Sequence, residues 1–199
     1  MDKGLLVVIS GPSGAGKGTI YRNIINGTDM MRSVSVTTRK PRPGEVEGVD
    51  YFFRTEEQYQ QMIAAGEFLE TAAVYNNFYG TPKAPVFENL EKGRDVLFEV
   101  DVHGAASIKK KYPETVTIFI MTPDFKTLEA RLRSRGTETE KSLKTRLGAA
   151  RHELSKYKMF DYIVFNDSVE DATKSVLDII FAEKSKVKNN LSVINKLLG

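Results

Sequence analysis

The sequence contains no cysteine and only two histidines, His103 and His152. Disulfide bonds, thiol catalysis and cysteine-based zinc sites are therefore excluded, and a histidine-rich metal site is not expected. No apolar run approaches the length that a membrane-spanning helix needs. The first apolar stretch, Leu5 to Ile9, is too short for the core of a signal peptide and leads directly into a glycine-rich loop. We therefore expect a cytoplasmic protein with no membrane partner.

The chain also lacks a large excess of charge of either sign. Its 29 Lys and Arg residues nearly balance its 26 Asp and Glu residues, which leaves a net charge of +3. This balance gives no indication of nucleic-acid binding, and it makes the positions of individual arginines more informative. With 41% hydrophobic and 28% charged residues among 199, the composition is that of an ordinary globular domain. We expect a single domain that is a monomer or a homodimer.

Short apolar runs alternate with helical patterns along much of the chain. The runs predict buried strands at residues 5–10, 96–101, 115–121 and 162–166. The patterns between and after them predict helices at residues 18–26, 104–111 and 169–185. Strands that alternate with helices favour a mostly parallel sheet covered on both faces. The predicted fold class is therefore α/β, with three layers around a central parallel sheet.

Two segments depart from this alternation. Residues 35–82 are rich in Thr, Arg, Pro, Gly and Tyr and predict short strands and turns, whereas residues 124–157 predict two helices. Arg131 and Arg135 flank the apolar stripe of the first of these helices, and Arg146 flanks that of the second. A solvated charged face explains these arginines as well as a ligand site does. Periodicity alone leaves both interpretations open.

A glycine-rich loop follows the first predicted strand and opens the first predicted helix. It reads Gly11-Pro12-Ser13-Gly14-Ala15-Gly16-Lys17-Gly18-Thr19. Its glycines allow successive backbone N–H groups to face phosphate oxygens, and the helix N-terminus adds a favourable dipole. Lys17 is placed to reach the outer phosphates as a point charge. The alternative is a strand-to-helix turn with no ligand, but strand, loop, lysine and helix in this order favour a P-loop NTPase fold that binds a nucleoside triphosphate.

The loop departs from the strict phosphate-loop pattern at Gly18, where a serine or threonine normally follows the lysine. Thr19 carries the next hydroxyl, about 100° further round the helix. Either Thr19 contacts phosphate and Mg²⁺, or the metal keeps more of its waters. The sequence leaves both arrangements open.

A second group of polar residues lies within residues 35–82. Arg39 and Arg42 stand near prolines and a glycine turn, in a loop and not on a solvated helix. The planar guanidinium of arginine can donate two parallel hydrogen bonds to a phosphate. Tyr51 and Tyr79 add hydroxyl donors. By themselves, two arginines and a tyrosine are more often ordinary surface residues.

Together, these motifs closely resemble the guanylate kinase family over about residues 4–180, in the family's order and spacing. The resemblance rests on the glycine-rich loop and on Thr37-Thr38-Arg39, Arg42, Glu45, Gly48, Tyr51-Phe52-Phe53, Gly66-Glu67-Phe68-Leu69-Glu70, Tyr79-Gly80-Thr81, Glu99-Val100-Asp101, Arg135-Gly136-Thr137-Glu138-Thr139 and Asn166-Asp167. It implies transfer of a phosphoryl group from ATP to GMP or dGMP, with Mg²⁺, in purine nucleotide metabolism. It also implies one domain over residues 1–199, with its core at 1–34, 83–123 and 158–199, a GMP-binding insertion at 35–82 and a lid at 124–157.

The resemblance implies a role for each matching position. The guanine base is expected at Ser35, Glu70, Thr81 and Asp101, and the GMP phosphate at Arg39, Arg42, Tyr51 and Tyr79. ATP is expected at residues 11–19 and at Arg131, Arg135 and Asn166, the last of these near the adenine. Catalysis is expected to depend on Lys17, Arg39, Arg135 and Arg146. Mg²⁺ is expected at Thr19, Glu99 and Asp101, through water at the carboxylates.

Two rival functions need to be separated from this one. Scaffold modules of the same family bind phosphorylated peptides, but they typically lose loop or acceptor residues, whereas this chain keeps Lys17, Arg39 and Arg42. The other rival is a kinase for a different nucleoside monophosphate. A carboxylate such as Glu70 can accept from the ring N–H and the amine of guanine, and adenine lacks that ring N–H. A site built on such pairing can reject the wrong base by about 10⁴ or more.

Overall fold

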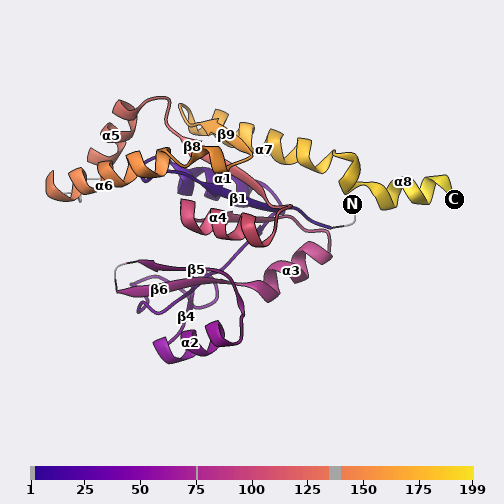
Figure 1. Ribbon diagram of the computed structural model, residues 1–199, viewed down its shortest axis with the longest axis horizontal. Coiled ribbons are helices and arrows are strands. Elements are labelled where there is room, and N and C mark those ends of the chain that lie inside the picture. The colour runs from indigo at the N-terminus through magenta and orange to yellow at the C-terminus, as the bar shows by residue number, and fades with distance from the viewer. Residues whose placement is uncertain (1–2, 75, 135–139) are drawn as a thin grey trace.

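The computed structural model describes residues 3–74, 76–134 and 140–199. Its centre is a five-stranded sheet in the order β2-β7-β1-β8-β9, and every neighbouring pair is parallel (Figure 1). The strands are β1 (Leu6–Ser10), β2 (Met31–Arg32), β7 (Val96–Glu99), β8 (Val116–Met121) and β9 (Tyr162–Phe165). The four strands predicted from apolar runs are confirmed, with ends shifted by at most two residues. The two-residue strand β2 was not predicted, because so short a segment carries no periodicity.

A second, four-stranded sheet lies apart from the first and has the order β4-β3-β6-β5 (Figure 1). Its strands are β3 (Val36–Thr37), β4 (Phe52–Phe53), β5 (Phe68–Val74) and β6 (Asn77–Pro82). β6 pairs antiparallel with both β3 and β5, whereas β3 and β4 are parallel. Helix α2 (Glu56–Ala64) packs Tyr59 against Phe68 and Phe78 of this sheet. The prediction of strands and turns alone was therefore incomplete, since α2 lies among them.

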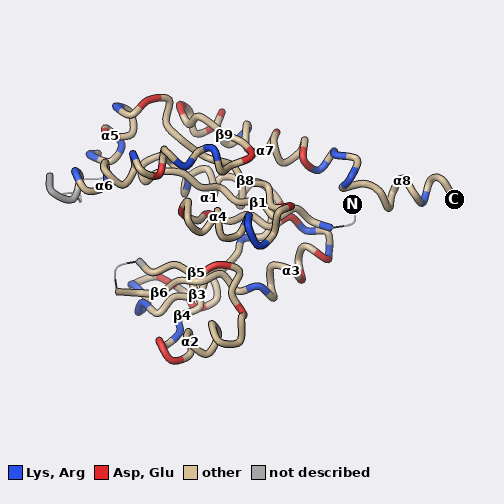
Figure 2. Tube along the Cα trace, in the orientation of Figure 1, with Lys and Arg blue, Asp and Glu red and all other residues tan. Residues whose placement is uncertain are grey.

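Two helices form a separate layer beside the end of the central sheet that the glycine-rich loop occupies (Figure 1). They are α5 (Phe125–Arg133) and α6 (Glu140–Leu154), which confirms the two helices predicted for this segment. They pack against each other through a small apolar cluster made of Leu128, Leu132, Leu143 and Ala150. Figure 2 shows Lys and Arg residues, in blue, at intervals along both helices. The two helices therefore carry positively charged residues and have an apolar cluster of their own, separate from the core of the central sheet.

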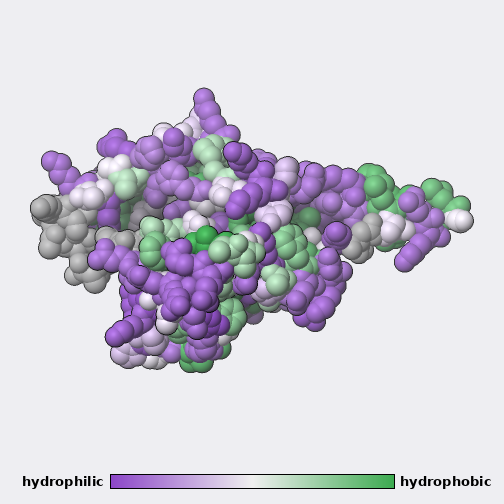
Figure 3. Space-filling view, turned by 60° about the horizontal axis from the view of Figure 1, so that its bottom comes forward, coloured by the Kyte–Doolittle hydropathy of each residue, from purple (hydrophilic) through white to green (hydrophobic). Residues whose placement is uncertain are grey.

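The C-terminal segment runs away from the rest of the molecule. Helix α7 (Val169–Lys184) confirms the helix predicted there, and the short turn η2 (Val187–Asn189) separates it from α8 (Leu191–Leu198). No described residue of α8 is buried, and Leu197 and Leu198 are 82% and 81% exposed. Figure 3 shows apolar residues, in green, gathered on this C-terminal extension. None of the helices in the described part of the chain has both the length and the apolar character needed to cross a bilayer.

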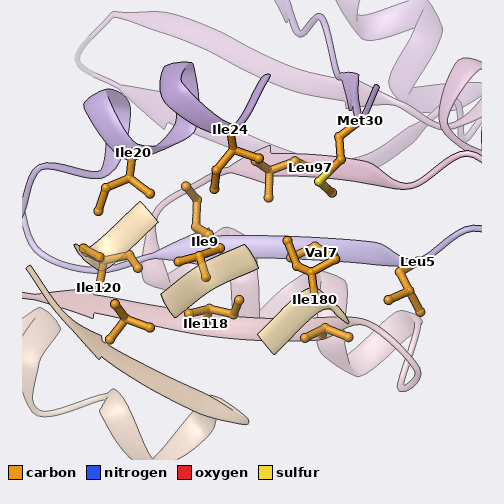
Figure 4. Packing of buried hydrophobic residues seen from close by; sticks show 14 of the residues in the cluster. Leu5, Val7, Ile9, Ile20, Ile24, Met30, Leu97, Ile118, Ile120 and Ile180 are labelled. Carbon is orange, nitrogen blue, oxygen red and sulfur yellow. The ribbon is translucent and has the colours of Figure 1, made fainter. Parts of the chain in front are cut away.

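The central sheet has an apolar cluster on each of its two faces. Side chains alternate along β1, so that Val7 and Ile9 face one way while Leu6 and Val8 face the other. Helices α1 (Lys17–Gly27) and α7 cover the first face (Figure 4), and α3 (Lys83–Glu91) and α4 (Val102–Lys111) cover the second. Burial of each such side chain stabilises the fold by about 1.5–3 kcal/mol. The three-layer α/β fold predicted from the sequence is therefore confirmed, and it places the carboxyl ends of β7, β1, β8 and β9, in that order, along one edge of the sheet.

Candidate active site

The glycine-rich loop leaves the end of β1 in a conformation that only glycine adopts readily. Gly11 and Gly16 have φ values of +140° and +88°. A Cβ at Gly11 would lie 2.0 Å from the carbonyl oxygen of Ile120, and one at Gly16 would lie 2.1 Å from Nδ2 of Asn166. The loop therefore packs directly on β8 and on the segment that follows β9, with no room for side chains at these two positions.

Asn166 supports this loop from beneath. Its side chain is fully buried, and Nδ2 donates a hydrogen bond to the carbonyl oxygen of Ala15 at 2.7 Å. The backbone oxygen of Asn166 accepts from Nη1 of Arg131 at 3.0 Å, and Nη2 of Arg131 lies 3.2 Å from the carbonyl oxygen of Asp167. The amide of Asn166 thus contacts the backbone of the loop, and Arg131 ties α5 to the segment after β9.

A cavity of about 560 Å³ opens over the loop. Lys17 lines this cavity, and its Nζ donates hydrogen bonds to the carbonyl oxygens of Gly11 and Pro12 at 2.7 and 3.1 Å. The other lining residues that matter for binding anions and metals are Ser13, Gly16, Thr19, Glu99, Asp101 and Glu153. The cavity therefore combines backbone donors, a lysine and three carboxylates, which suits a phosphate chain together with a hydrated cation.

The donors near Gly18 fit a magnesium ion that arrives with its nucleotide. A Cβ at Gly18 would lie 3.4 Å from Oε2 of Glu99 and 3.6 Å from Nη1 of Arg22, so the position after the loop lysine lies against a carboxylate and a guanidinium. Thr19 is exposed, and its hydroxyl lies 3.4 Å from Nη2 of Arg22. Among the described residues, no three His, Cys, Asp or Glu side chains are grouped so as to hold a metal by themselves. The Thr19 hydroxyl and the carboxylates of Glu99 and Asp101 are oxygen donors, the kind that Mg²⁺ uses together with water and phosphate oxygens.

A second, smaller cavity of about 140 Å³ adjoins the first. Ser35 and Thr81 line it, and Tyr51 and Glu99 line both cavities. Beside it, Glu70 is only 6% exposed and accepts a hydrogen bond from the Thr81 hydroxyl at 2.8 Å. Burial raises the pKa of Glu70, and the Thr81 hydrogen bond opposes that rise. The structure therefore brings a buried carboxylate and hydroxyl donors close to the larger cavity.

One carboxylate oxygen of Asp101 is used in the protein's own structure. It caps helix α4, because Oδ1 accepts the backbone N–H of Gly104 at 2.8 Å. The cap fixes the carboxylate at the carboxyl end of β7, on the wall of the larger cavity. Asp101 lies two residues after Glu99, which lines the same cavity, and its charge adds to the rise in the pKa of Glu70 that burial causes.

Glu45 organises the two arginines predicted to hold a phosphate. Its carboxylate accepts from Nη2 of Arg39 at 2.8 Å and from the backbone N–H of Arg42 at 2.7 Å. The Arg39 guanidinium holds the pKa of Glu45 below its usual range and also lies 5.5 Å from the ring centre of Tyr51. The rings of Tyr51 and Tyr79 are 6.0 Å apart. Arg39, Tyr51 and Tyr79 therefore form one group, whereas the side chain of Arg42 is exposed at its edge.

Comparison with known proteins decides the family. The family model for guanylate kinase matches residues 3–183. A guanylate kinase of Clostridioides difficile is 50% identical over 98% of this chain and 95% of its own, and one of Caldanaerobacter subterraneus is 47% identical over 98% and 95%. The crystal structure of guanylate kinase from Anaplasma phagocytophilum has a TM-score of 0.73 at 33% identity, covering 94% of this chain and 89% of its own.

The chain belongs to the guanylate kinase family.

The family resemblance read from the sequence is thereby confirmed. Of the residues to which it gave a role, the two cavities are lined by Gly11, Ser13, Gly14, Gly16, Lys17, Gly18, Thr19, Ser35, Tyr51, Thr81, Glu99 and Asp101. The linings do not include Arg39, Arg42, Glu70, Tyr79, Arg131, Arg146 or Asn166. The arginines of the helical segment are less uniform. Arg131 is bonded to the segment after β9, and Arg146 is half-buried in α6. Arg135 lies outside the described residues.

Two charged residues that line the larger cavity, Arg22 and Glu153, were not predicted from the sequence. Glu153 is the more informative of the two. It comes from the last turn of α6, and its Oε2 accepts the backbone N–H of Ser13 in the glycine-rich loop at 3.3 Å. The available signal was its position three residues after the buried Ala150, which places an acidic residue at the edge of the buried stripe of α6. Among guanylate kinase features predicted from this sequence, no motif contained it.

Proposed function

We propose that this protein catalyses transfer of the γ-phosphoryl group of ATP to GMP, and also to dGMP, giving ADP and the guanine nucleoside diphosphate. The observation that carries this proposal is the pair of adjoining cavities that share Tyr51 and Glu99. One contains a phosphate loop, and the other lies beside a buried carboxylate. Two nucleotides bound there would meet with their phosphates at the shared wall. The division into core (1–34, 83–123, 158–199), insertion (35–82) and lid (124–157) remains part of the proposal.

The acceptor base is assigned to the group around Glu70. An ionised carboxylate can accept both the ring N–H and the exocyclic amine of guanine, while the Ser35 and Thr81 hydroxyls can donate to the guanine carbonyl. Adenine would present a lone pair in place of the ring N–H and leave the buried carboxylate unpaired. Support comes from the 6% exposure of Glu70 and from its hydrogen bond with Thr81. Asp101 completes this group.

The acceptor phosphate is assigned to the residues that Glu45 organises. The Arg39 guanidinium is already oriented by Glu45 and by the Tyr51 ring, so little side-chain freedom remains to be lost on binding. Tyr51 and Tyr79 supply hydroxyl donors, and Arg42 adds a second guanidinium at the edge. Bidentate donation by arginine would fix the orientation of the phosphate oxygen that attacks.

The donor nucleotide is assigned to residues 11–19. Backbone N–H groups of the loop and the N-terminus of α1 would hold the β- and γ-phosphates, with Lys17 released from Gly11 and Pro12 to reach them. Asn166 would act through the loop backbone, and Arg131 would lie beside it. The hydroxyl of Thr19 and the carboxylates of Glu99 and Asp101, through water, would hold Mg²⁺. When bound, Mg²⁺ neutralises part of the phosphate charge.

The reaction needs positioning and charge neutralisation more than proton transfer. A phosphate monoester has a second pKa of about 6, so the acceptor is largely ionised at neutral pH and needs no strong base. One of its oxygens attacks the γ-phosphorus, the bond to the bridging oxygen breaks, and ADP leaves with the electron pair. Lys17, Arg39, Arg135 and Arg146 offset the repulsion between the two anions. Closure of the insertion and the lid would exclude water, which would otherwise hydrolyse ATP.

A coupled assay of ADP release tests this function. ATP with GMP or dGMP should give rapid turnover, whereas AMP, CMP and UMP should give turnover lower by about 10⁴. Absence of turnover with every nucleotide would favour the scaffold-module reading, and equal turnover with AMP would remove the guanine site from the account.

A further inference from the structure

The lid carries a carboxylate into the site that should hold phosphate. Helix α6 ends at Leu154, and Glu153 in its last turn lines the larger cavity together with Ser13, Gly16 and Lys17. Oε2 of Glu153 accepts the backbone N–H of Ser13 at 3.3 Å. That N–H is one of the donors through which a glycine-rich loop binds an anion. Glu153 therefore occupies part of the anion site with an anion that belongs to the protein.

The surroundings of Glu153 act on its charge in both directions, and burial has the largest effect. Burial raises the pKa of Glu153, and the nearby ammonium of Lys17 and the hydrogen bond from Ser13 draw it back towards the charged form. Asp101 and His103 also face it, with opposite effects. Lys17 meanwhile donates to two carbonyl oxygens of its own loop. The backbone N–H of Ser13 and the ammonium of Lys17, which a triphosphate would need as donors, thus already donate to acceptors of the protein.

A second contact holds the same end of α6 against the core. The ring of His152, next to Glu153, stacks on the ring of His103 in α4, with centroids 6.5 Å apart and planes 27° apart. Glu153 and His152 reach different parts of the core, the loop and α4. A phosphate chain that displaces Glu153 from Ser13 would therefore act on the helix end that also carries His152.

We propose that Glu153 is a positioning residue that competes with ATP for the phosphate loop, so that entry of the triphosphate expels Glu153 and frees α6, with Arg146, to close over the transferring group. This inference rests on the proposed role of residues 11–19 in binding ATP. The triphosphate succeeds because it carries several negative charges against one, and because it binds many loop donors where Glu153 binds one. The competition lowers the apparent affinity for ATP by the fraction of molecules in which Glu153 holds the loop.

Glu153→Gln is the sharpest test, because the amide keeps the size of the side chain and removes its charge. We would titrate inorganic pyrophosphate without metal, and ATP with Mg²⁺, into the wild type and the variant by calorimetry. The gain in affinity should be roughly 5- to 50-fold for both ligands, the usual size of a coupling between two binding events. Glu153→Asp keeps the charge but shortens the side chain by one methylene group, so its affinities should lie between those of the wild type and Glu153→Gln.

Two further proteins serve as controls. Glu88→Gln removes the same charge from an exposed residue of α3 that lines neither cavity, and its affinities should stay within about twofold of the wild type, because distant exposed charges are screened. Lys17→Met should lose pyrophosphate binding. Thermal unfolding of each variant without ligand identifies a purely structural role, since a simple tether would lower the melting temperature of Glu153→Gln and leave the pyrophosphate affinity unchanged.

The outcomes are separable. Equal or weaker binding of pyrophosphate and ATP by Glu153→Gln, with ATP still bound by the wild type, would overturn the competition alone. Failure of the wild type itself to bind ATP would overturn the proposed function on which it rests. Tighter binding by Glu153→Gln combined with a lower KM for ATP supports the inference.

Discussion

Glu70→Gln tests the base site with almost no change in shape. The amide oxygen can still accept the hydrogen bond that Thr81 now donates at 2.8 Å, so the local structure should persist. The amide nitrogen, however, would face one of the two N–H groups of guanine, and two donors would meet. Loss of a hydrogen bond to a charged group, with a buried donor left unpaired, costs about 2–4 kcal/mol. At 1.36 kcal/mol per decade, kcat/KM for GMP should fall roughly 30- to 900-fold.

The loss should appear mainly in the KM for GMP, because the base is held equally in the ground state and the transition state. ATP affinity, measured separately by titration, should change by less than about twofold, since independent sites are nearly additive. Glu67→Gln is the matched control, because Glu67 is exposed and lies three positions before Glu70. An unchanged KM for GMP in Glu70→Gln would refute the assignment of guanine to this carboxylate.

The same substitution should stabilise the ligand-free protein. Burial raises the pKa of Glu70 above its unfolded value, so the folded state binds the proton more tightly than the unfolded state does. The associated stability is fully present below the unfolded pKa and is lost as pH rises through the folded pKa. At pH 7 the variant should therefore melt higher than the wild type, and the difference should shrink as the pH falls through the folded pKa. A lower melting temperature at pH 7 would contradict this sign.

Three more substitutions test the donor side. Lys17→Met should reduce kcat by at least about 10³ with little change in melting temperature, and near-normal turnover would remove the loop from the mechanism. Arg146→Ala should lower kcat by about 10²–10³ and change GMP affinity far less, because a lid charge acts mainly in the transition state; steady-state kinetics that show an equal loss in affinity would argue against this. Asn166→Ala removes the 2.7 Å hydrogen bond to Ala15, so the free energy of unfolding should drop by about 1–3 kcal/mol. The affinity for ATP should fall more than the affinity for GMP. An unchanged midpoint of chemical denaturation would contradict this prediction.

The parts of the fold that were predictable have a local cause. Buried strands such as β1 and β8 are continuous apolar runs, and the glycine-rich loop is a contiguous motif between a strand and a helix. Helix α2 was not predicted, because Tyr59 is its one buried residue and its apolar periodicity is therefore weak. The capping box of Thr55 and Gln58 was a usable signal that hydrophobic patterning did not include.

Contacts between residues far apart in the chain could not be predicted from the sequence. Ser13 and Glu153 are 140 positions apart, and nothing near either residue in the sequence indicates that they meet. The family resemblance placed Asn166 near the adenine, yet its amide is buried against Ala15. Such roles depend on how α6 and β9 pack beside the loop, which sequence periodicity does not encode.

The close approach of Gly16 and Asn166 limits how this protein can evolve. A Cβ at Gly16 would overlap the Asn166 amide at 2.1 Å, and the φ of +88° at Gly16 would strain any side chain even if position 166 became smaller. A smaller residue at position 166 would itself remove the hydrogen bond to Ala15, 151 positions away, and loosen the loop. We expect these two residues to be inherited as a pair wherever this loop is retained.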